Sequence, residues 1–274
     1  MAAAEKVLDM KVLKKIHTGV LTKEKEGFHP FHELFYISEG TCSVFIGHRA
    51  YQMKEGDFAV IPAGILHRTD YTSSAQNTKY VVSFSRRTAR QLDTFLGEPL
   101  ADRDLHQGRV RVPVQRREAV ARLLIRMLYE YENQPVHAAA FCKACLAELL
   151  ISLQRYRAGA EENEGLLSPK AERMQAVAAY LSEHMREDLT LQTLSEVFAV
   201  SPSHLSRTFH EATGFGLREY LVNLRIQRAG ELLLNSGLTI TEIADRCGFS
   251  DSNYFGDAFR KAMGVSPREY RKLG

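Results

Sequence analysis

The C-terminal part of this chain contains the same helical unit twice. The first copy ends with the segment GFGLREY at residues 214–220, and the second ends with GVSPREY at residues 264–270. The offset between matching positions changes by one residue near the start of the second copy's last helix. A repeat that keeps its order across an insertion in a turn indicates two copies of one supersecondary structure.

The first copy has the pattern of a short helix, a tight turn and a second helix. Thr190 can cap a helix that extends to Phe198, because a threonine hydroxyl accepts hydrogen bonds from the first backbone amides. Ser201 followed by Pro202 matches the start of a second helix, and we expect that helix to stop at Gly214. This pattern predicts a helix-turn-helix, whose second helix can enter the major groove of DNA.

The second copy repeats this pattern, and one long helix is expected to join the two copies. Thr239 is the expected cap of its first helix. Ser250 or Asp251 caps its second helix, which we expect to end at Gly264. Residues 217–235 predict the joining helix, with apolar side chains directed toward both units.

Several short segments in this region follow one another in the order of a known protein family. They are LRIQRA at 224–229, ITEIA at 240–244, CGFS at 247–250, YF at 254–255 and FRK at 259–261. With them, residues 170–273 resemble the DNA-binding domain of AraC/XylS-type bacterial transcription regulators. The resemblance implies that the chain binds double-stranded DNA and acts with RNA polymerase.

The resemblance also assigns base contacts to the exposed positions of each second helix. Arg207 is the leading candidate because its planar fork matches O6 and N7 of guanine, and Asn253 could pair with adenine. The alternative for any single polar residue here is a solvated helix face. The expected base-contacting residues are Ser203, His204, Ser206 and Arg207 in the first unit and Ser252, Asn253 and Asp257 in the second.

The second unit departs from the family pattern, and the domain has little net charge. The family often has a basic residue where Asp257 stands, and an acid would repel phosphate or accept from cytosine N4. Gly256 beside it destabilises a helix by roughly 1 kcal/mol relative to alanine. Basic and acidic residues are equally numerous between Lys170 and Lys272, so affinity must come from local clustering or a dimer. The expected phosphate contacts are Arg218, Arg260, Lys261, Arg268 and Arg271.

The N-terminal part contains short strand-like segments separated by glycine, aspartate and proline turns. The clearest segments are 34–37, 42–46, 51–53, 58–61 and 80–84. Short strands at this spacing predict a small β barrel or jelly roll.

Two motifs in this part resemble those of the cupin fold. Residues 56–67 have the pattern G-x5-P-x-G-x2-H of its second motif, and His29, Glu33 and Gly40 match most of its first. Cupins are the usual sensory domain of sugar-responsive members of the regulator family, so the resemblance implies a small-molecule effector, expected to be a sugar or a derivative. The residues expected to hydrogen-bond such a ligand are His29, His32, Glu33, Tyr36, His67 and Arg68.

The same resemblance raises the question of a metal ion. His29, Glu33 and His67 fall on three ligand positions of metal cupins, and two imidazoles with a carboxylate could hold Fe, Mn or Zn. However, Gly27 replaces the first histidine of the family motif. We expect no cofactor, while a divalent metal at these residues and purely structural histidines stay open as alternatives.

The middle of the chain is expected to be helical. Residues 113–133 and 137–157 carry apolar side chains at three-to-four spacing, which predicts two amphipathic helices. They resemble the family's dimerisation element, although they could also simply cover the barrel, and we favour a homodimer. The predicted organisation is a cupin-like barrel at 1–112, a helical dimerisation or covering element at 113–157, a linker at 158–169 and a double helix-turn-helix domain at 170–274.

The fold class is therefore expected to be α+β with two domains. The family resemblance implies a bacterial protein, and the remaining features favour the cytoplasm. Cys142 and Cys145 have C-x-x-C spacing within a predicted helix, where packing is favoured over zinc or redox chemistry. The sequence shows neither a long apolar run nor the apolar core of a signal peptide, so no membrane partner is expected.

These observations predict a transcription regulator, an activator rather than an enzyme, that responds to a small molecule. Two alternatives stay open at this point. One is a metal-dependent cupin enzyme fused to a DNA-binding tail, and the other is a regulator without a small-molecule ligand.

Overall fold

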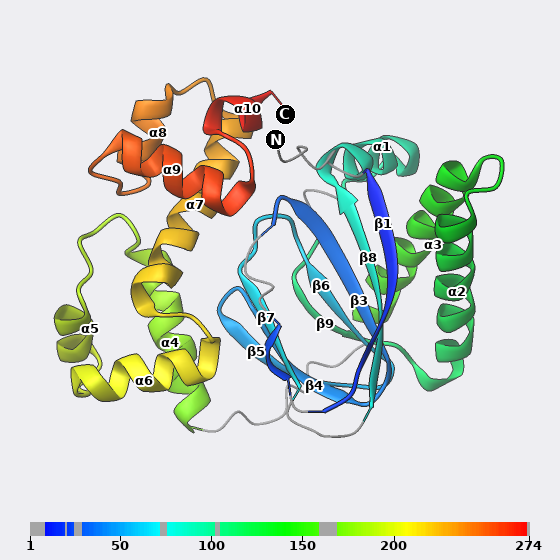
Figure 1. Cartoon of the computed structure of the whole chain (residues 1–274), viewed down its shortest axis with the longest axis horizontal. Coiled ribbons are helices and arrows are strands. Elements are labelled where there is room, and N and C mark those ends of the chain that lie inside the picture. The colour runs from blue at the N-terminus through cyan, green and yellow to red at the C-terminus, as the bar shows by residue number, and fades with distance from the viewer. Residues whose placement is uncertain are drawn as a thin grey trace.

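Two antiparallel β-sheets form the N-terminal part of the chain, and helices form the rest (Figure 1). The computed structural model describes residues 9–19, 21–24, 29–71, 76–101, 105–158 and 169–272. The expected α+β architecture is confirmed, with a cupin-like barrel followed by an all-helical double helix-turn-helix domain. Gly27 and most of the predicted linker, residues 159–168, lie outside the described residues.

The barrel consists of a five-stranded and a four-stranded sheet that face each other. The five-stranded sheet has the order β1 (Met10–His17), β8 (Asn77–Ser85), β3 (Phe31–Glu39), β6 (Asp57–Ile61) and β9 (Gly108–Arg111). The four-stranded sheet has the order β2 (Leu21–Glu24), β7 (His67–Tyr71), β4 (Thr41–Ile46) and β5 (Arg49–Lys54). All five predicted strand segments lie within strands, whereas β1, β2, β7 and β9 were not predicted.

Strand alternation divides the side chains of the five-stranded sheet between two cores. Phe35 and Val81 point inward and form part of the barrel interior. Leu34 and Val82, one position away on the same strands, belong to a second core under the helices. The outer face of this sheet is therefore as buried as the inner one, and its strands are apolar on both sides.

Three helices cover that outer face (Figure 1). The predicted pair is present as α2 (Arg117–Asn133) and α3 (Ala138–Ala158), with a short 3₁₀ turn, η1 (Val114–Arg116), before α2. Helix α1 (Arg86–Leu96) was not predicted, although Ser85 caps it by accepting from the amide of Thr88. Leu123 and Leu124 of α2 and Leu146 of α3 are buried against the sheet.

The C-terminal domain follows the sequence prediction closely. Its helices are α4 (Pro169–Glu183), α5 (Leu191–Val197), α6 (Pro202–Thr213), α7 (Leu217–Asn235), α8 (Ile240–Arg246), α9 (Ser252–Met263) and α10 (Pro267–Arg271). Thr190 and Thr239 cap the first helix of each unit, and Gly214 and Gly264 end the second helices with φ angles of 81° and 75°. Of the two candidates for the α9 cap, Asp251 is the one whose side chain accepts the amide hydrogen bond.

The two helix-turn-helix units have separate cores, and the first shares its core with the barrel. Leu205, Phe209 and Tyr220 pack together with Phe45 and Leu66 of the barrel. The second unit packs on itself and on α7. The barrel is therefore docked on the first unit through buried apolar contact.

Candidate DNA interface and ligand site

The second helix of the first unit, α6, presents a polar surface to solvent. Ser203, His204, Ser206 and Arg207 are all exposed, while Leu205 lies in the core. The side chain of Arg207 is 71% exposed, and its Nε lies 4.0 Å from Glu211 Oε1, at the outer limit of an ion pair. Such a pair contributes little in water, so the guanidinium can turn toward a base edge at small cost.

Helix α9 presents the corresponding surface of the second unit. Ser252, Asn253 and Asp257 are exposed there. A Cβ added at Gly256 would meet no heavy atom within 4 Å, so packing does not require glycine at this position. The acidic side chain of Asp257 thus faces solvent directly, and the glycine beside it weakens the helix without a packing reason.

The expected phosphate-binding residues differ in their environments. Arg218, Arg260, Lys261 and Arg268 are exposed. Arg271 is instead half-buried and donates from Nη2 to the carbonyl oxygen of Leu238. Its guanidinium is thus directed toward the domain's own backbone.

Arg225 in the joining helix α7 has a positioning role that the sequence did not reveal. Its Nε donates to Met185 O at 2.7 Å, and its Nη2 donates to Glu187 O at 2.8 Å. Its guanidinium carbon also lies 5.9 Å from the ring centroid of Phe249 in the second unit. Arg225 therefore connects the turn between α4 and α5, just before the first unit, with Phe249 of the second unit. Its place in the LRIQRA motif was the available signal.

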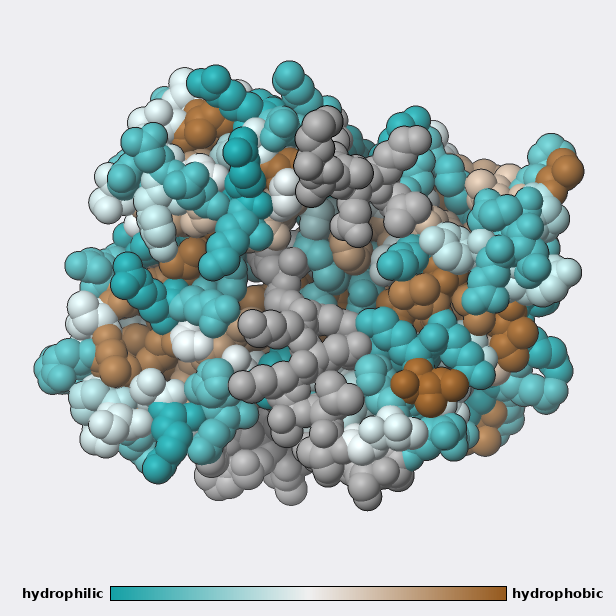
Figure 2. Space-filling model, in the orientation of Figure 1, coloured by the Kyte–Doolittle hydropathy of each residue, from teal (hydrophilic) through white to brown (hydrophobic). Residues whose placement is uncertain are grey.

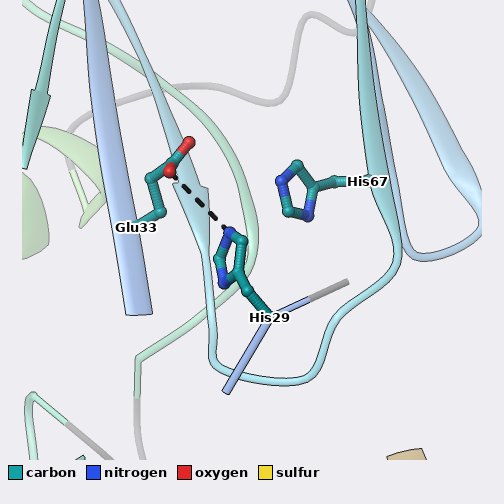
Figure 3. A group of neighbouring side chains, drawn as sticks. All are labelled: His29, Glu33 and His67. Atoms are coloured by element: carbon teal, nitrogen blue, oxygen red, sulfur yellow. Dashed lines mark ion pairs between the residues drawn. The ribbon is translucent and has the colours of Figure 1, made fainter. Parts of the chain in front are cut away.

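His29, Glu33 and His67 converge at one end of the barrel interior (Figure 3). His29 lies just before β3, Glu33 is on β3, and His67 begins β7. One ligand atom from each lies within 4.8 Å of the others, and His29 Nε2 is 3.7 Å from Glu33 Oε2. Ser83 on the neighbouring strand adds a hydroxyl 3.5 Å from the same carboxylate oxygen.

Backbone carbonyls fix the orientation of both imidazoles in this cluster. Nδ1 of His29 lies 2.8 Å from Phe31 O, and Nδ1 of His67 lies 2.9 Å from Ile65 O. A carbonyl only accepts, so each Nδ1 carries a proton, and when a ring is neutral its lone pair is on Nε2. These are the nitrogens that can accept from a ligand hydroxyl or bind a cation.

The chemical types of these three side chains suit a divalent metal ion. Two neutral imidazoles, each anchored through Nδ1–H to a carbonyl, and one carboxylate are a common combination for transition metals. Metal–ligand bonds of about 2.0–2.2 Å would place ligand atoms about 3.4 Å apart in a tetrahedral site. Side-chain rotations would therefore have to draw the three residues closer together, since their ligand atoms now span up to 4.8 Å.

The other three predicted ligand residues do not join this cluster. His32 and Tyr36 lie on the opposite face of β3 from Glu33, where His32 stacks on Phe84 and Tyr36 packs on Phe58. Burial raises the pKa of Tyr36, which is consistent with its place under the helices. Arg68 lies on the outer face of β7, where its Nε donates to Asp70 at 2.8 Å. The geometry thus corrects the expectation that these residues line the barrel, because neighbours along a strand face opposite ways.

The barrel interior contains polar residues that the sequence analysis missed. Lys79 is 1% exposed, and its Nζ lies 4.8 Å from the ring centroid of Phe35 and 5.7 Å from that of Tyr71. Thr69 is fully buried on β7, two positions after His67. Alternation from Glu33 and His67 across paired strands was the signal that could have found both residues.

The barrel contacts the first helix-turn-helix unit through the outer face of β4 and β7. Tyr220 donates from its hydroxyl to Gly47 O at 2.7 Å, and its ring lies edge-on to Phe45 with centroids 6.2 Å apart. Arg68 lies against Gly214, the residue that ends α6, so closely that an added Cβ would fall 1.8 Å from Arg68 Nη1. Strand β7 therefore carries His67 and Thr69 on its inner face and a contact to α6 on its outer face.

The C-x-x-C pair is a packing feature of α3. Cys142 and Cys145 are buried free thiols, and burial raises the pKa of Cys142 to about 11. A thiol with a raised pKa is neither a good metal ligand nor a good nucleophile at neutral pH. In the described residues, no helix is both long and apolar enough to cross a membrane.

Comparisons with known proteins match both domains. Residues 22–150 match the model of an AraC-like ligand binding domain, and residues 194–273 match that of a helix-turn-helix domain. The HTH-type transcriptional activator RhaS of Enterobacter sp. (strain 638) is 30% identical over 249 residues, 90% of this chain and 87% of that protein.

Two solved structures are also similar to part or most of this chain. The C-terminal domain of AraT, a response regulator from Geobacillus stearothermophilus, is 40% identical and covers 39% of this chain and 88% of its own, with a TM-score of 0.37. ToxT from Vibrio cholerae O395 is 13% identical and covers 97% of this chain and 98% of its own, with a TM-score of 0.40.

The whole-length relative is a transcriptional activator, so this chain is grouped with regulators and not with enzymes. The two family models that match this chain describe an AraC-like ligand binding domain and a helix-turn-helix domain. The chain belongs to the AraC family of DNA-binding transcription regulators.

Proposed function

We propose that this regulator activates transcription in the bacterial cytoplasm when a hydroxylated small molecule, a sugar or a sugar derivative, binds inside its barrel. One observation carries the proposal. Strand β7 holds His67 and Thr69 on the barrel's inner face, while Arg68 on its outer face lies against the end of the DNA-facing helix α6. A ligand inside the barrel and the end of α6 would thus contact the same strand.

The chemistry of the interior supports a polyhydroxylated ligand. The Nε2 lone pairs of His29 and His67 and the carboxylate of Glu33 accept hydrogen bonds. The ammonium of Lys79 and the hydroxyl of Thr69 donate them. Thr69 Oγ1 is buried and has no hydrogen-bond partner among the described residues, and a buried hydroxyl is normally satisfied. A ligand hydroxyl at this position would satisfy it.

Transmission to DNA follows from the shared strand. His67 pairs with Ile46 across β4, and the next pair, Arg68 with Phe45, faces the first helix-turn-helix unit. A ligand that shifts β7 or β4 changes the barrel surface that Tyr220 and Gly214 contact. The ligand must favour one docking arrangement over another for this to alter DNA binding.

We assign DNA recognition to α6 and α9 and phosphate contacts to the exposed cations around them. Arg207 is the main base-reading residue because it is exposed and only loosely paired. Arg218, Arg260, Lys261 and Arg268 are placed to position the domain on the backbone. Contacts with RNA polymerase are part of this proposal for an activator.

We further propose a homodimer formed through residues 113–157. Hydrophobic surface is visible over α2 at the right of Figure 2. Ile125 and Tyr129 of α2 are 50% and 62% exposed, and Val136 in the turn that follows is 86% exposed. Exposed apolar side chains on a helix pair are typical of an association surface. The change Ile125→Glu should shift the dimer toward the monomer, and analytical ultracentrifugation measures this shift.

A metal ion in the barrel is a second candidate ligand, favoured by one specific observation. Both Nδ1–H groups donate to carbonyls, which aims both Nε2 lone pairs at the space beside Glu33. Metal analysis of the purified protein decides between the two. About one equivalent of metal that is lost in His67→Ala favours the metal, and a sugar response in metal-free protein favours direct hydrogen bonding.

The central experiment selects bound genomic fragments with purified protein at a fixed salt concentration, with and without a panel of aldoses and ketoses. We expect footprinted boxes roughly 10 bp apart, protected more strongly with one sugar. Thr69→Val should lose the sugar response while folding normally, because the change removes a hydroxyl that makes no hydrogen bond within the described residues. Exposed Thr41→Val is the matched control. A sugar response that is identical in Thr69→Val and the parent contradicts the barrel site.

A further inference from the structure

A cavity at the junction of the two helix-turn-helix units is lined only by residues of the DNA-binding domain. Its volume is about 730 Å³, which is within the usual range of small-molecule sites. Helix α7, which runs from the first unit to the second (Figure 1), forms one wall. The end of α4 with the turn that leads into the first unit forms another, and Arg246 at the end of α8 completes the cavity. A molecule held there would touch both sides of the junction.

Three arginines line this cavity, one from each of its walls. They are Arg186 in the turn after α4, Arg228 on α7 and Arg246 on α8, and Glu231 is the one acidic side chain among the lining residues. Arg228 forms an ion pair with Glu231 at 2.7 Å. Within the part of the chain that the structure describes, Arg186 and Arg246 are exposed and form no ion pair or hydrogen bond. The cavity thus has a net positive charge that its own ion pair does not neutralise.

Backbone packing holds these arginines together, although they come from distant parts of the chain. Gly248, in the turn after α8, lies against the turn after α4 so closely that an added Cβ would fall 2.9 Å from the Cα of Arg186. Arg225 donates to the carbonyl oxygens of the residues on either side of Arg186, at 2.7 and 2.8 Å. The backbone of Arg186 is therefore fixed beside the end of α8.

The charges of this region also act on one buried group, Cys247, which follows α8. Burial raises the pKa of the Cys247 thiol to about 11, and the positive charges of Arg228, Arg186 and Arg225 act in the opposite direction. Arginines from both sides of the junction are thus near the same point. Like charges gathered in this way repel one another, and an anion among them removes that repulsion.

The rest of the lining suits a phosphate group with polar neighbours. The fork of an arginine side chain matches two phosphate oxygens at once, so arginines on separate walls can hold one phosphate from several directions. Gln227 and Ser182 add neutral hydrogen-bonding groups, and the carboxylate of Glu231 can accept from a hydroxyl.

We propose that this cavity is a phosphate-binding site that joins the two helix-turn-helix units. Arg186 holds the phosphate from the side of the first unit, Arg246 from the second unit and Arg228 from α7. The phosphate comes from a free phosphate ester or from the DNA backbone, since a duplex contacted by both α6 and α9 runs past this junction. A bound phosphate fixes one unit relative to the other, and with it the distance between the two DNA-reading helices.

Inorganic pyrophosphate is the probe for a free phosphate, and isothermal titration calorimetry on the full chain without DNA measures its binding. We expect binding that weakens with added salt, because the attraction is between charges. Arg186→Ala and Arg246→Ala should each weaken it about tenfold or more, and both residues are exposed, so neither change disturbs a core. Arg173→Ala removes an exposed arginine of α4 that does not line the cavity, and it is the matched control.

DNA binding at several salt concentrations tests the other source of phosphate. If the phosphate belongs to the DNA backbone, Arg186→Ala should reduce the slope of log affinity against log salt by about one and leave the base preferences unchanged. Arg173→Ala should keep the slope of the parent protein.

The two measurements together decide the proposal. Pyrophosphate binding that is lost in Arg186→Ala and Arg246→Ala supports a free phosphate, and a reduced salt slope without pyrophosphate binding supports the DNA backbone. Neither effect, or equal effects in Arg173→Ala, overturns the site. The DNA measurement rests on the proposed use of α6 and α9, whereas the pyrophosphate measurement needs neither DNA nor a sugar. A parent protein that binds pyrophosphate but no DNA would therefore contradict the proposed function and leave this site supported.

Discussion

The contact between Tyr220 and Gly47 predicts that one hydroxyl group couples the two domains. In Tyr220→Phe the ring keeps its contacts with Phe45 and Phe209, and only the 2.7 Å hydrogen bond to Gly47 O is lost. A buried hydrogen bond contributes about 1 kcal/mol net, and leaving its acceptor unsatisfied costs about 1–3 kcal/mol. We therefore expect the docked arrangement to lose about 1–2 kcal/mol, which corresponds to roughly a 5–30-fold change in the docking equilibrium.

Two measurements test this prediction. Urea unfolding of the full chain should show a lower free energy of unfolding for Tyr220→Phe, and the difference in DNA affinity with and without effector should shrink. Tyr180→Phe is the matched control, because Tyr180 packs against the same cluster and its hydroxyl makes no hydrogen bond within the described residues. Equal effects of the two changes, or an unaltered effector response in Tyr220→Phe, would refute the argument that this contact transmits the signal.

Three other predictions concern single residues. Arg207→Ala should cost about 1–3 kcal/mol of DNA binding and relax specificity at one base pair, and equal binding to all sites in a selection would contradict the groove assignment. Gly256→Ala should raise the free energy of unfolding in urea by up to about 1 kcal/mol, because a Cβ there meets open space, and a decrease would show an unrecognised strain. Cys142 and Cys247 should resist maleimide in native protein at about pH 8, since a pKa of about 11 keeps each thiol protonated, and rapid labelling would contradict their burial.

The helix-turn-helix domain could be predicted almost to the residue because its signals are local. The caps Thr190, Ser201 and Thr239 form hydrogen bonds within three residues of themselves. Gly214 and Gly264 have positive φ angles that favour glycine over other residues. Such signals do not depend on the rest of the fold, so a single sequence contains them in full.

The barrel was less predictable because its strands are defined by partners far along the chain. Strand β7 has the sequence HRTDY, whose inward residues are polar or aromatic, so no apolar alternation marks it. Strand β9 is short and carries two arginines, and it is defined by its pairing with β6, far away along the chain. Helix α1 contains few apolar residues, and its cap at Ser85 lay at the end of a predicted strand.

In the ligand site too, the sequence motifs identified some residues, whereas others depend on how the strands pair. The cupin motifs identified His29, Glu33 and His67, which lie together. They could not identify Lys79, because a lysine in a strand ordinarily faces water and only the pairing of β8 with β3 turns it inward. Tyr36 was assigned to the site by closeness along the chain, but it lies on the opposite face of β3 from Glu33.

The electrostatics of the DNA domain bear on how it achieves specificity. Non-specific affinity rises with the number of phosphates neutralised, and this domain has equal numbers of acidic and basic residues from Lys170 to Lys272. With Arg271 directed to Leu238 and Asp257 exposed on α9, the second unit's attraction for phosphate rests on Arg260, Lys261 and Arg268. Binding then also depends on the first unit, on a second copy of the chain, and on how firmly the barrel holds α6. The free energy of DNA binding is small for a weakly charged domain, so a docking change of 1.4 kcal/mol, about tenfold in affinity, is a larger share of it. DNA binding by such a domain is therefore more sensitive to docking.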